Sequence, residues 1–235
     1  MQHQSIKILK LVIVLIIALV GAYKTNQLEA QKYDDSIASV EIVKTPAGDA
    51  LVSIPIKGRA PKTNYSREQF GDGWEILNGC DMRNRILARD LKEISYVPTM
   101  EPVVCKVMSG VLHDPYTAKT VAFLRGPDTS DDVQIDHVVA LSDAWQKGAQ
   151  GLTPQQRLAF ANDPLELLAV DGGANQQKSD SDAASWLPAN KAYRCQYVAR
   201  QIAVKKKYSL WVTRSEYDAM ADVLKSCPDQ KIPTT

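Results

Sequence analysis

Residues 133–141 read Val133-Gln134-Ile135-Asp136-His137-Val138-Val139-Ala140-Leu141, which sets an acid and a histidine side by side in an apolar run. Apolar and β-branched residues favour a buried strand. Neighbouring residues of a strand point to opposite faces, so Asp136 and His137 can serve one centre only where the strand ends or bends. We therefore predict a buried strand that carries a chemically active pair at its end.

A second apolar run precedes a group of polar side chains, since residues 165–178 read LELLAVDGGANQQK. We predict a strand over Leu165–Val170, a Gly-Gly turn, and a helix that begins near Ala174. Asn175 and Lys178 are about one turn apart and so share a face of that helix. A strand, a strand and a helix with these side chains are the outline of a ββα-metal site.

The residue types in this outline suit the hydrolysis of a phosphodiester, which needs an activated water and charge relief on the leaving oxygen. A histidine can accept the proton from water, which makes His137 the candidate base. A hard divalent ion prefers carboxylate and amide oxygens, so Asp136 and Asn175 are the candidate metal ligands. We expect Mg²⁺, with Mn²⁺ or another divalent ion as alternatives. Lys178 is a further catalytic candidate that could neutralise phosphate charge.

A helix is predicted over residues 80–91, and it carries two arginines that are candidates for binding phosphate, Arg83 and Arg85. The guanidinium fork matches phosphate oxygens. The alternative is a solvated helix face paired with Asp81 and Asp90. Other candidate backbone contacts are Lys191 and Lys205-Lys206-Lys207. For this lysine run, a solvated helix end is the alternative.

Local patterns predict the remaining elements. Residues 51–56 suggest an edge strand, and residues 103–112 and 120–126 suggest an antiparallel hairpin. Thr153 and Thr213 are placed to cap two helices. The predicted helices cover residues 141–149, 153–162, 191–207 and 213–224.

The N-terminus has the composition of a targeting segment. Lys7 and Lys10 precede the apolar run Leu11–Val20, which fits the h-region of a signal peptide and is short for a membrane-spanning helix. A cleaved signal peptide and an uncleaved membrane anchor stay as alternatives. Either one places the rest of the chain outside the cytoplasm, secreted or anchored on the outer side of a membrane, after contact with the secretion machinery.

Composition supports a globular protein with a substantial core. Of the 235 residues, 45% are hydrophobic, and the formal net charge of +1 argues against a surface that is basic throughout. We divide the chain into a targeting segment (1–23), a linker (24–50), a folded domain (51–228) and a tail (229–235). We expect a monomer.

The chain has four cysteines, Cys80, Cys105, Cys195 and Cys227. An even number in an exported chain suggests two disulfides. Four cysteines allow three pairings, and pairing between sequence neighbours would close one loop in each half of the mature chain. A zinc site is the rival interpretation, but no pair has C-x-x-C spacing.

Together, several short segments resemble the exported HNH endonuclease family proteins, which are related to the C-terminal domain of GmrSD-type restriction enzymes. The segments that carry the resemblance are Gly58-Arg59-Ala60-Pro61, Tyr65–Gly71 (YSREQFG), Cys80–Asn84 (CDMRN), Asp114–Thr117 (DPYT), Ile135–Leu141 (IDHVVAL), Asn162–Leu165 (NDPL), Ala174–Asp180 (ANQQKSD) and Trp186-Leu187-Pro188. The resemblance implies an α+β fold with a ββα-metal (His-Me finger) HNH core, elaborated with helices. It implies action on DNA, with Asp136 and Asn175 as ligands and His137 as general base.

Position 166 departs from the HNH pattern, which has asparagine there and uses it to brace the loop around the histidine. This chain has Glu166, and an ionised glutamate accepts hydrogen bonds but does not donate them. Either Glu166 braces the loop differently, or Asn162 helps, or activity is weakened.

Two functions follow from the sequence. The first is a metal-dependent endonuclease that cuts DNA with low sequence specificity, with RNA as an alternative substrate. The second is a non-catalytic envelope or nucleic-acid-binding protein that keeps the HNH scaffold, and Glu166 is the residue that favours it.

Overall fold

Strands β6 (Val133–His137) and β7 (Leu167–Asp171) pair antiparallel and carry the apolar runs on which the prediction was built. The structure is a computed structural model, and it describes residues 20–25, 27, 45–100 and 103–234. His137 lies opposite Leu167 in the register and is the last residue of β6. The predicted strand end at the Asp136–His137 pair is therefore confirmed.

Helix α6 (Gly172–Lys178) follows β7 without a separate turn. The Asp171 side chain caps it by accepting a hydrogen bond from the backbone N of Ala174 at 2.8 Å. The predicted Gly-Gly turn is wrong, because both glycines belong to the first turn of the helix. A Cβ on Gly172 would lie 2.0 Å from the carbonyl oxygen of Asp131, so the tight approach of these two segments requires glycine.

A three-stranded antiparallel sheet has the order β3 (Lys92–Tyr96), β4 (Val107–His113) and β5 (Thr120–Leu124). The predicted hairpin is confirmed as β4 and β5, with Leu112 opposite Val121. Strand β3 was not predicted, because most of its KEISY side chains are exposed and no alternation marks them as half-buried. A short ribbon, β1 (Ile76–Leu77) with β2 (Cys80–Asp81), precedes α3.

The helix predicted over residues 80–91 is confirmed as α3 (Met82–Asp90), which packs between the two sheets. The Asp81 side chain caps it by accepting from the backbone N of Asn84 at 2.8 Å. The core here joins α3 to both sheets through Met82, Ile86, Leu87, Leu91, Val107, Leu112, Phe123, Val133, Ile135, Leu167 and Ala169. Burying these side chains is what fixes the inner face of β6 and β7.

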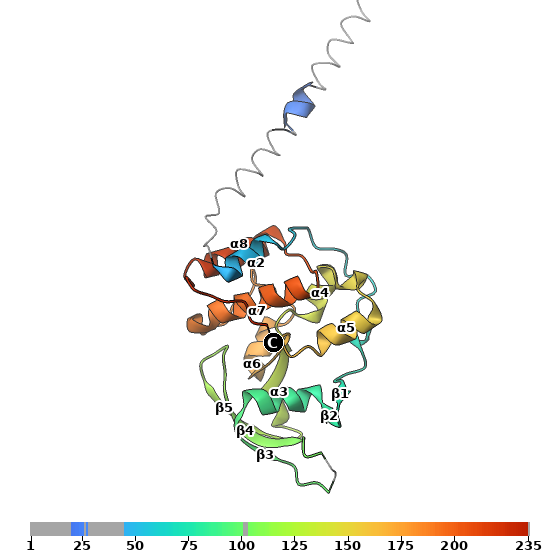
Figure 1. Cartoon of the computed structure of the whole chain (residues 1–235), viewed down its shortest axis with the longest axis vertical. Coiled ribbons are helices and arrows are strands. Elements are labelled where there is room, and N and C mark those ends of the chain that lie inside the picture. Colours follow the sequence, from blue (N-terminus) through green and yellow to red (C-terminus); the bar gives the residue numbers. More distant parts are fainter. Residues whose placement is uncertain (1–19, 26, 28–44, 101–102, 235) are drawn as a thin grey trace, which may run out of the picture. The chain divides into compact units, whose positions relative to one another are not determined.

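The remaining helices gather at the other end of the domain from β3–β5 (Figure 1). They are α2 (Pro46–Val52), α4 (Leu141–Gln146), α5 (Pro154–Ala161), α7 (Arg194–Lys207) and α8 (Arg214–Leu224). Short 3-10 turns cover Arg67–Phe70 (η1), Ser130–Asp132 (η2), Ala149–Gly151 (η3) and Lys191–Tyr193 (η4). The capping boxes at Thr153 and Thr213 are both formed.

A buried network of charges ties α4, α7 and α8 together. The Nζ of Lys147 lies 2.7 Å from Asp143, 2.7 Å from Asp182 and 2.6 Å from Glu216. The Nζ of Lys205 lies 2.9 Å from Glu216. Both lysine side chains are 0% exposed, so Lys205 belongs to the core and not to a basic surface run.

The cysteines form Cys80–Cys105 and Cys195–Cys227, the pairing between sequence neighbours. No cysteine is left to bind zinc, because all four lie in the described ranges and are bonded. The first bridge ties β2 to the segment that leads into β4, and the second ties α7 to the residues after α8.

The start of the fold differs from the predicted boundary. Residues assigned to a linker and an edge strand form α2, which Thr45 caps and which buries Ala47, Ala50 and Leu51. The edge strand predicted at residues 51–56 is wrong, because a helix that begins at Pro46 continues to Val52. Within this segment, Ile56 makes an isolated β-bridge to Val212.

The targeting segment predicted at residues 1–23 lies mostly outside the described residues. Of the helices formed by the residues that are described, none has the length and apolar content needed to cross a membrane.

Candidate functional site

His137 lies at the junction of two cavities, and its ring is held on two sides. Its Nε2 is 3.0 Å from the carbonyl oxygen of Ala161, and its ring stacks on Trp74 with centroids 5.8 Å apart. A carbonyl only accepts, so Nε2 carries the proton and Nδ1 keeps its lone pair. Burial lowers the pKa of His137 to about 3, and the positive charges of Arg67 and Lys178 act in the same direction. The imidazole is therefore neutral near pH 7, with one basic nitrogen available.

Asp136 lies beside His137 and is 4% exposed. Its Oδ1 accepts from Nζ of Lys178 at 2.8 Å, and its Oδ2 accepts from the Tyr116 hydroxyl at 2.5 Å. Burial raises the pKa of this carboxyl, although Lys178 opposes the effect. Tyr116 was not singled out in the sequence; it stands in the DPYT segment, far from β6 along the chain.

Lys178 does not lie where a phosphate contact would need it. Its side chain is 0% exposed, and its Nζ donates to Asp136 and to the backbone oxygen of His137, each at 2.8 Å. Lys178 lies on α6, and its buried ammonium group compensates the negative charge of the Asp136 carboxylate from inside the fold. A phosphate in the cavity cannot reach an ammonium group held inside the fold.

The backbone of residues 137–139 is braced by several buried groups. A side-chain oxygen of Glu166 accepts from the backbone N of Val139 at 3.1 Å, and the Glu166 carbonyl accepts from Val138 N at 2.9 Å. Burial raises the pKa of the Glu166 carboxyl well above its usual range. Nε2 of Gln201 on α7 donates to the Val138 carbonyl at 2.7 Å. Glu166 thus braces the loop by accepting hydrogen bonds. Gln201 was missed because nothing in its local sequence links it to β6.

Asn162, the other residue considered for bracing, acts elsewhere. Its Oδ1 accepts from the backbone N of Glu75 at 2.8 Å, and its Nδ2 donates to the Leu158 carbonyl at 3.1 Å. Glu75 directly follows Trp74, so Asn162 fixes the segment that stacks on His137 and not the loop after it.

Asn175 and Asp136 line the same cavity, which has a volume of about 500 Å³ and also includes His137. The Nδ2 of Asn175 donates to Oε1 of Gln134 at 2.8 Å. Because this bond uses the amide nitrogen, the amide oxygen is left as the free acceptor. Gln134 thus orients Asn175, a role that the sequence alone did not suggest.

The donor set suits a hard divalent ion with few protein ligands. Each oxygen of Asp136 has one hydrogen-bond partner and a second lone pair, and Asn175 adds an amide oxygen. Mg²⁺ is commonly held by one or two protein oxygens together with waters and substrate phosphate. In the described part of the chain, no three His, Cys, Asp or Glu side chains cluster to hold a metal, so a richer site of that kind is not found there.

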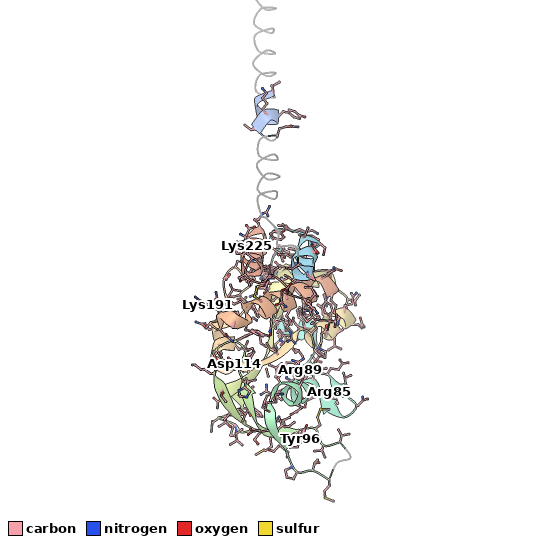
Figure 2. All side chains as sticks on the ribbon, turned by 60° about the vertical axis from the view of Figure 1, so that its left-hand side comes forward. Arg85, Arg89, Tyr96, Asp114, Lys191 and Lys225 are labelled. Atoms are coloured by element: carbon pink, nitrogen blue, oxygen red, sulfur yellow. A yellow bond between two sulfur atoms is a disulfide. The ribbon has the colours of Figure 1, made fainter. Side chains whose placement is uncertain are left out.

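The predicted phosphate-binding arginines have different places. Arg83 lines the 500 Å³ cavity, but its Nη2 donates to the carbonyls of Ser130 and Val133, each at 3.2 Å. Arg85 points away from this cavity and donates to the Leu77 carbonyl at 2.8 Å. Figure 2 shows Arg85 on α3 and Lys191 at a separate part of the surface. Only Arg83 of the three lies at the site.

Removing the Glu166 brace tests its structural role. Glu166→Ala leaves the buried Val139 N–H without an acceptor and should lower the free energy of unfolding by about 1–3 kcal/mol. Glu166→Gln keeps an oxygen for Val139 and should lose less. Urea unfolding and hydrogen exchange at the Val139 amide measure both effects. Equal protection of that amide in the alanine variant and the parent would contradict the assignment.

The low pKa of His137 predicts a specific dependence of stability on pH. The pKa is about 3 in the folded chain and about 6.5 when unfolded, so the unfolded state binds more protons between these values. The contribution of His137 to the free energy of unfolding is fully present above about pH 6.5 and is lost as the pH falls towards 3. The parent should lose about 1–3 kcal/mol relative to His137→Gln between about pH 7 and 4.5, measured by urea unfolding. Parallel pH profiles would contradict this.

Comparison with known proteins connects this geometry to a family. The model of the GmrSD restriction endonucleases, C-terminal domain, matches residues 81–223. An uncharacterized secreted protein of Arthroderma benhamiae is 34% identical over 183 residues, which cover 77% of this chain and 84% of that protein. No solved structure matches the chain. Because the family match covers more than half of the chain and includes Asp136, His137, Glu166 and Asn175, the chain belongs to the family of the GmrSD restriction endonuclease C-terminal domain.

Proposed function

We propose that this chain is an exported, metal-dependent endonuclease of the HNH type that hydrolyses phosphodiester bonds of DNA with low sequence specificity. The single observation that carries the proposal is the His137 ring, neutral and with Nδ1 unprotonated, in a cavity that also holds the Asp136 and Asn175 oxygens. The β6–β7–α6 order supports a ββα-metal core for this site.

His137 is the general base of the proposed reaction. The bond from Nε2 to the Ala161 carbonyl selects the tautomer, and stacking on Trp74 holds the ring plane. Nδ1 then takes the proton from the attacking water. The same carbonyl stabilises the imidazolium that results, because it accepts from Nε2–H in both states.

Asp136 and Asn175 would hold the divalent ion. Such an ion supplies charge stabilisation at the scissile phosphate and the leaving oxygen. Lys178 and Tyr116 orient the Asp136 carboxylate, and Gln134 orients the Asn175 amide. Partners of this kind tune metal ligands in other proteins.

Two observations support a location outside the cytoplasm. The two disulfides suit an oxidising compartment, and the Arthroderma benhamiae relative is called a secreted protein. We propose that the mature chain is a monomer in that compartment.

A non-catalytic nucleic-acid-binding role is the second candidate. Glu166 in place of asparagine favours it, and so does Asp136, whose two oxygens already have partners inside the protein. This candidate predicts DNA binding without cleavage under any metal condition.

Plasmid nicking separates the two candidates. Supercoiled DNA is incubated with the parent in Mg²⁺, Mn²⁺ or other divalent ions, and in EDTA, with an RNA substrate in parallel. Nicking that requires a divalent ion supports the enzyme. Asn175→Ala should lose this activity, whereas Gln177→Ala, an exposed position on the same helix, should keep it. If the parent leaves DNA and RNA intact with every ion, the enzyme proposal fails.

A further inference from the structure

Two cavities meet at His137. The 500 Å³ cavity contains the proposed ligands, and a second cavity of about 390 Å³ is lined by Trp74, Gly71 and Ala161. Arg67, His137 and Leu141 line both of them. A substrate atom beside His137, the proposed base, therefore lies where the two cavities meet, and Arg67 lines both cavities there.

Arg67 is an exposed cation at this boundary. Among the residues that the structure describes, none makes a hydrogen bond or an ion pair with its guanidinium. The other cations near the site differ, since Arg83 donates to two backbone carbonyls and Lys178 is buried against Asp136. Of these cations near His137, Arg67 is thus the one whose N–H groups remain available to a ligand.

The backbone that carries Arg67 is firmly anchored. Arg67 opens η1, and Phe70 at the other end of η1 is 1% exposed, with its ring 5.8 Å from that of Phe160. Nε of Arg157 donates to the Gln69 carbonyl at 2.7 Å. A donor on an anchored backbone segment holds its ligand in a better-defined position than a donor on a mobile loop.

Charge indicates the side from which an anion reaches Arg67. The 390 Å³ cavity also has Glu68 and Asp72 in its lining, and these carboxylates repel phosphate. The 500 Å³ cavity has a second cation, Arg83. The acidic side chains that line this larger cavity have their charge compensated, because Asp136 pairs with Lys178 and Asp180 pairs with Lys62. An anion therefore approaches through the larger cavity.

We infer that Arg67 binds the scissile phosphate from the 500 Å³ cavity, with its guanidinium donating to the non-bridging oxygens. The inference rests on the proposed function and names a residue of the same site. Guanidinium binds phosphate through two parallel N–H groups, which fixes orientation as well as charge. The negative charge on these oxygens is stabilised in the transition state without any change in the protonation of Arg67.

Single-turnover nicking at saturating DNA is the first test. Arg67→Ala should slow the rate by about 10²–10³-fold, and Arg67→Lys should recover only part of it, because lysine has the charge without the fork. Arg85→Ala is the matched control: it removes an exposed arginine outside both cavities and should keep the parent rate. A parent rate for Arg67→Ala would overturn the inference.

Binding without metal gives a readout that does not depend on cleavage. Affinity for a fluorescent DNA duplex is measured in EDTA over a range of salt concentrations. Loss of one phosphate contact in Arg67→Ala should reduce the slope of log K against log salt by about 1, while Arg85→Ala should keep the parent slope. If the parent does not nick DNA, the proposed function fails, and this test still decides whether Arg67 contacts a DNA phosphate. An unchanged slope in Arg67→Ala would then overturn the inference.

Discussion

His137→Ala is expected to nick supercoiled plasmid about 10²–10⁴-fold more slowly than the parent, the range typical for loss of a general base. The reason is specific to this geometry. Nε2 is committed to the Ala161 carbonyl, so Nδ1 is the ring nitrogen that can take a proton from water. Alanine removes that nitrogen and leaves the proposed metal ligands in place.

Controls must separate chemistry from folding, because the His137 ring also stacks on Trp74. Thermal unfolding of His137→Ala shows how much folded protein is present, and rates are compared per folded molecule. His113→Ala is the matched histidine control. His113 is exposed on β4, where its Nδ1 lies 3.3 Å from Thr120 Oγ1, and the His113→Ala variant should nick at the parent rate. A parent rate for folded His137→Ala would exclude His137 as the base.

Lys147→Met is expected to cause the largest loss of stability, about 3–5 kcal/mol. Lys147 is 0% exposed and lies within 2.7 Å of Asp143, Asp182 and Glu216. In Lys147→Met, these three buried carboxylates lose the ammonium group that they all contact. Removal of one partner from a buried ion pair leaves the charge of the other uncompensated, which is costly. For a domain of this size, the melting temperature should fall by roughly 6–20 °C.

Lys206→Met is the control for Lys147→Met. Lys206 is exposed near the end of α7, beside the buried Lys205, and its loss should change the free energy of unfolding by no more than about 0.5 kcal/mol. Calorimetry on both variants gives the comparison. If Lys147→Met were as stable as Lys206→Met, the network would not stabilise the fold.

Local sequence was sufficient for several elements. The spacing of Met82, Ile86 and Leu91 predicted α3, and the threonines at 153 and 213 predicted two helix starts that the structure confirms. These features depend on hydrogen bonds and periodicity within a few residues, so neighbours in the chain determine them. Strand β3 and helix α2 were not predicted, since an exposed edge strand and a short proline-led helix have weak local patterns.

The sequence by itself also determined the candidate residues of the site, because an acid–histidine pair in a β-branched run and a later Asn are unusual enough to stand out. Tertiary structure decided what surrounds them. Lys178 has the spacing of a surface helix residue but is buried against Asp136, and Tyr116 and Gln201 reach the site from distant segments. Burial and pairing depend on which segments pack together. That outcome comes from the whole core, and no window of sequence contains it.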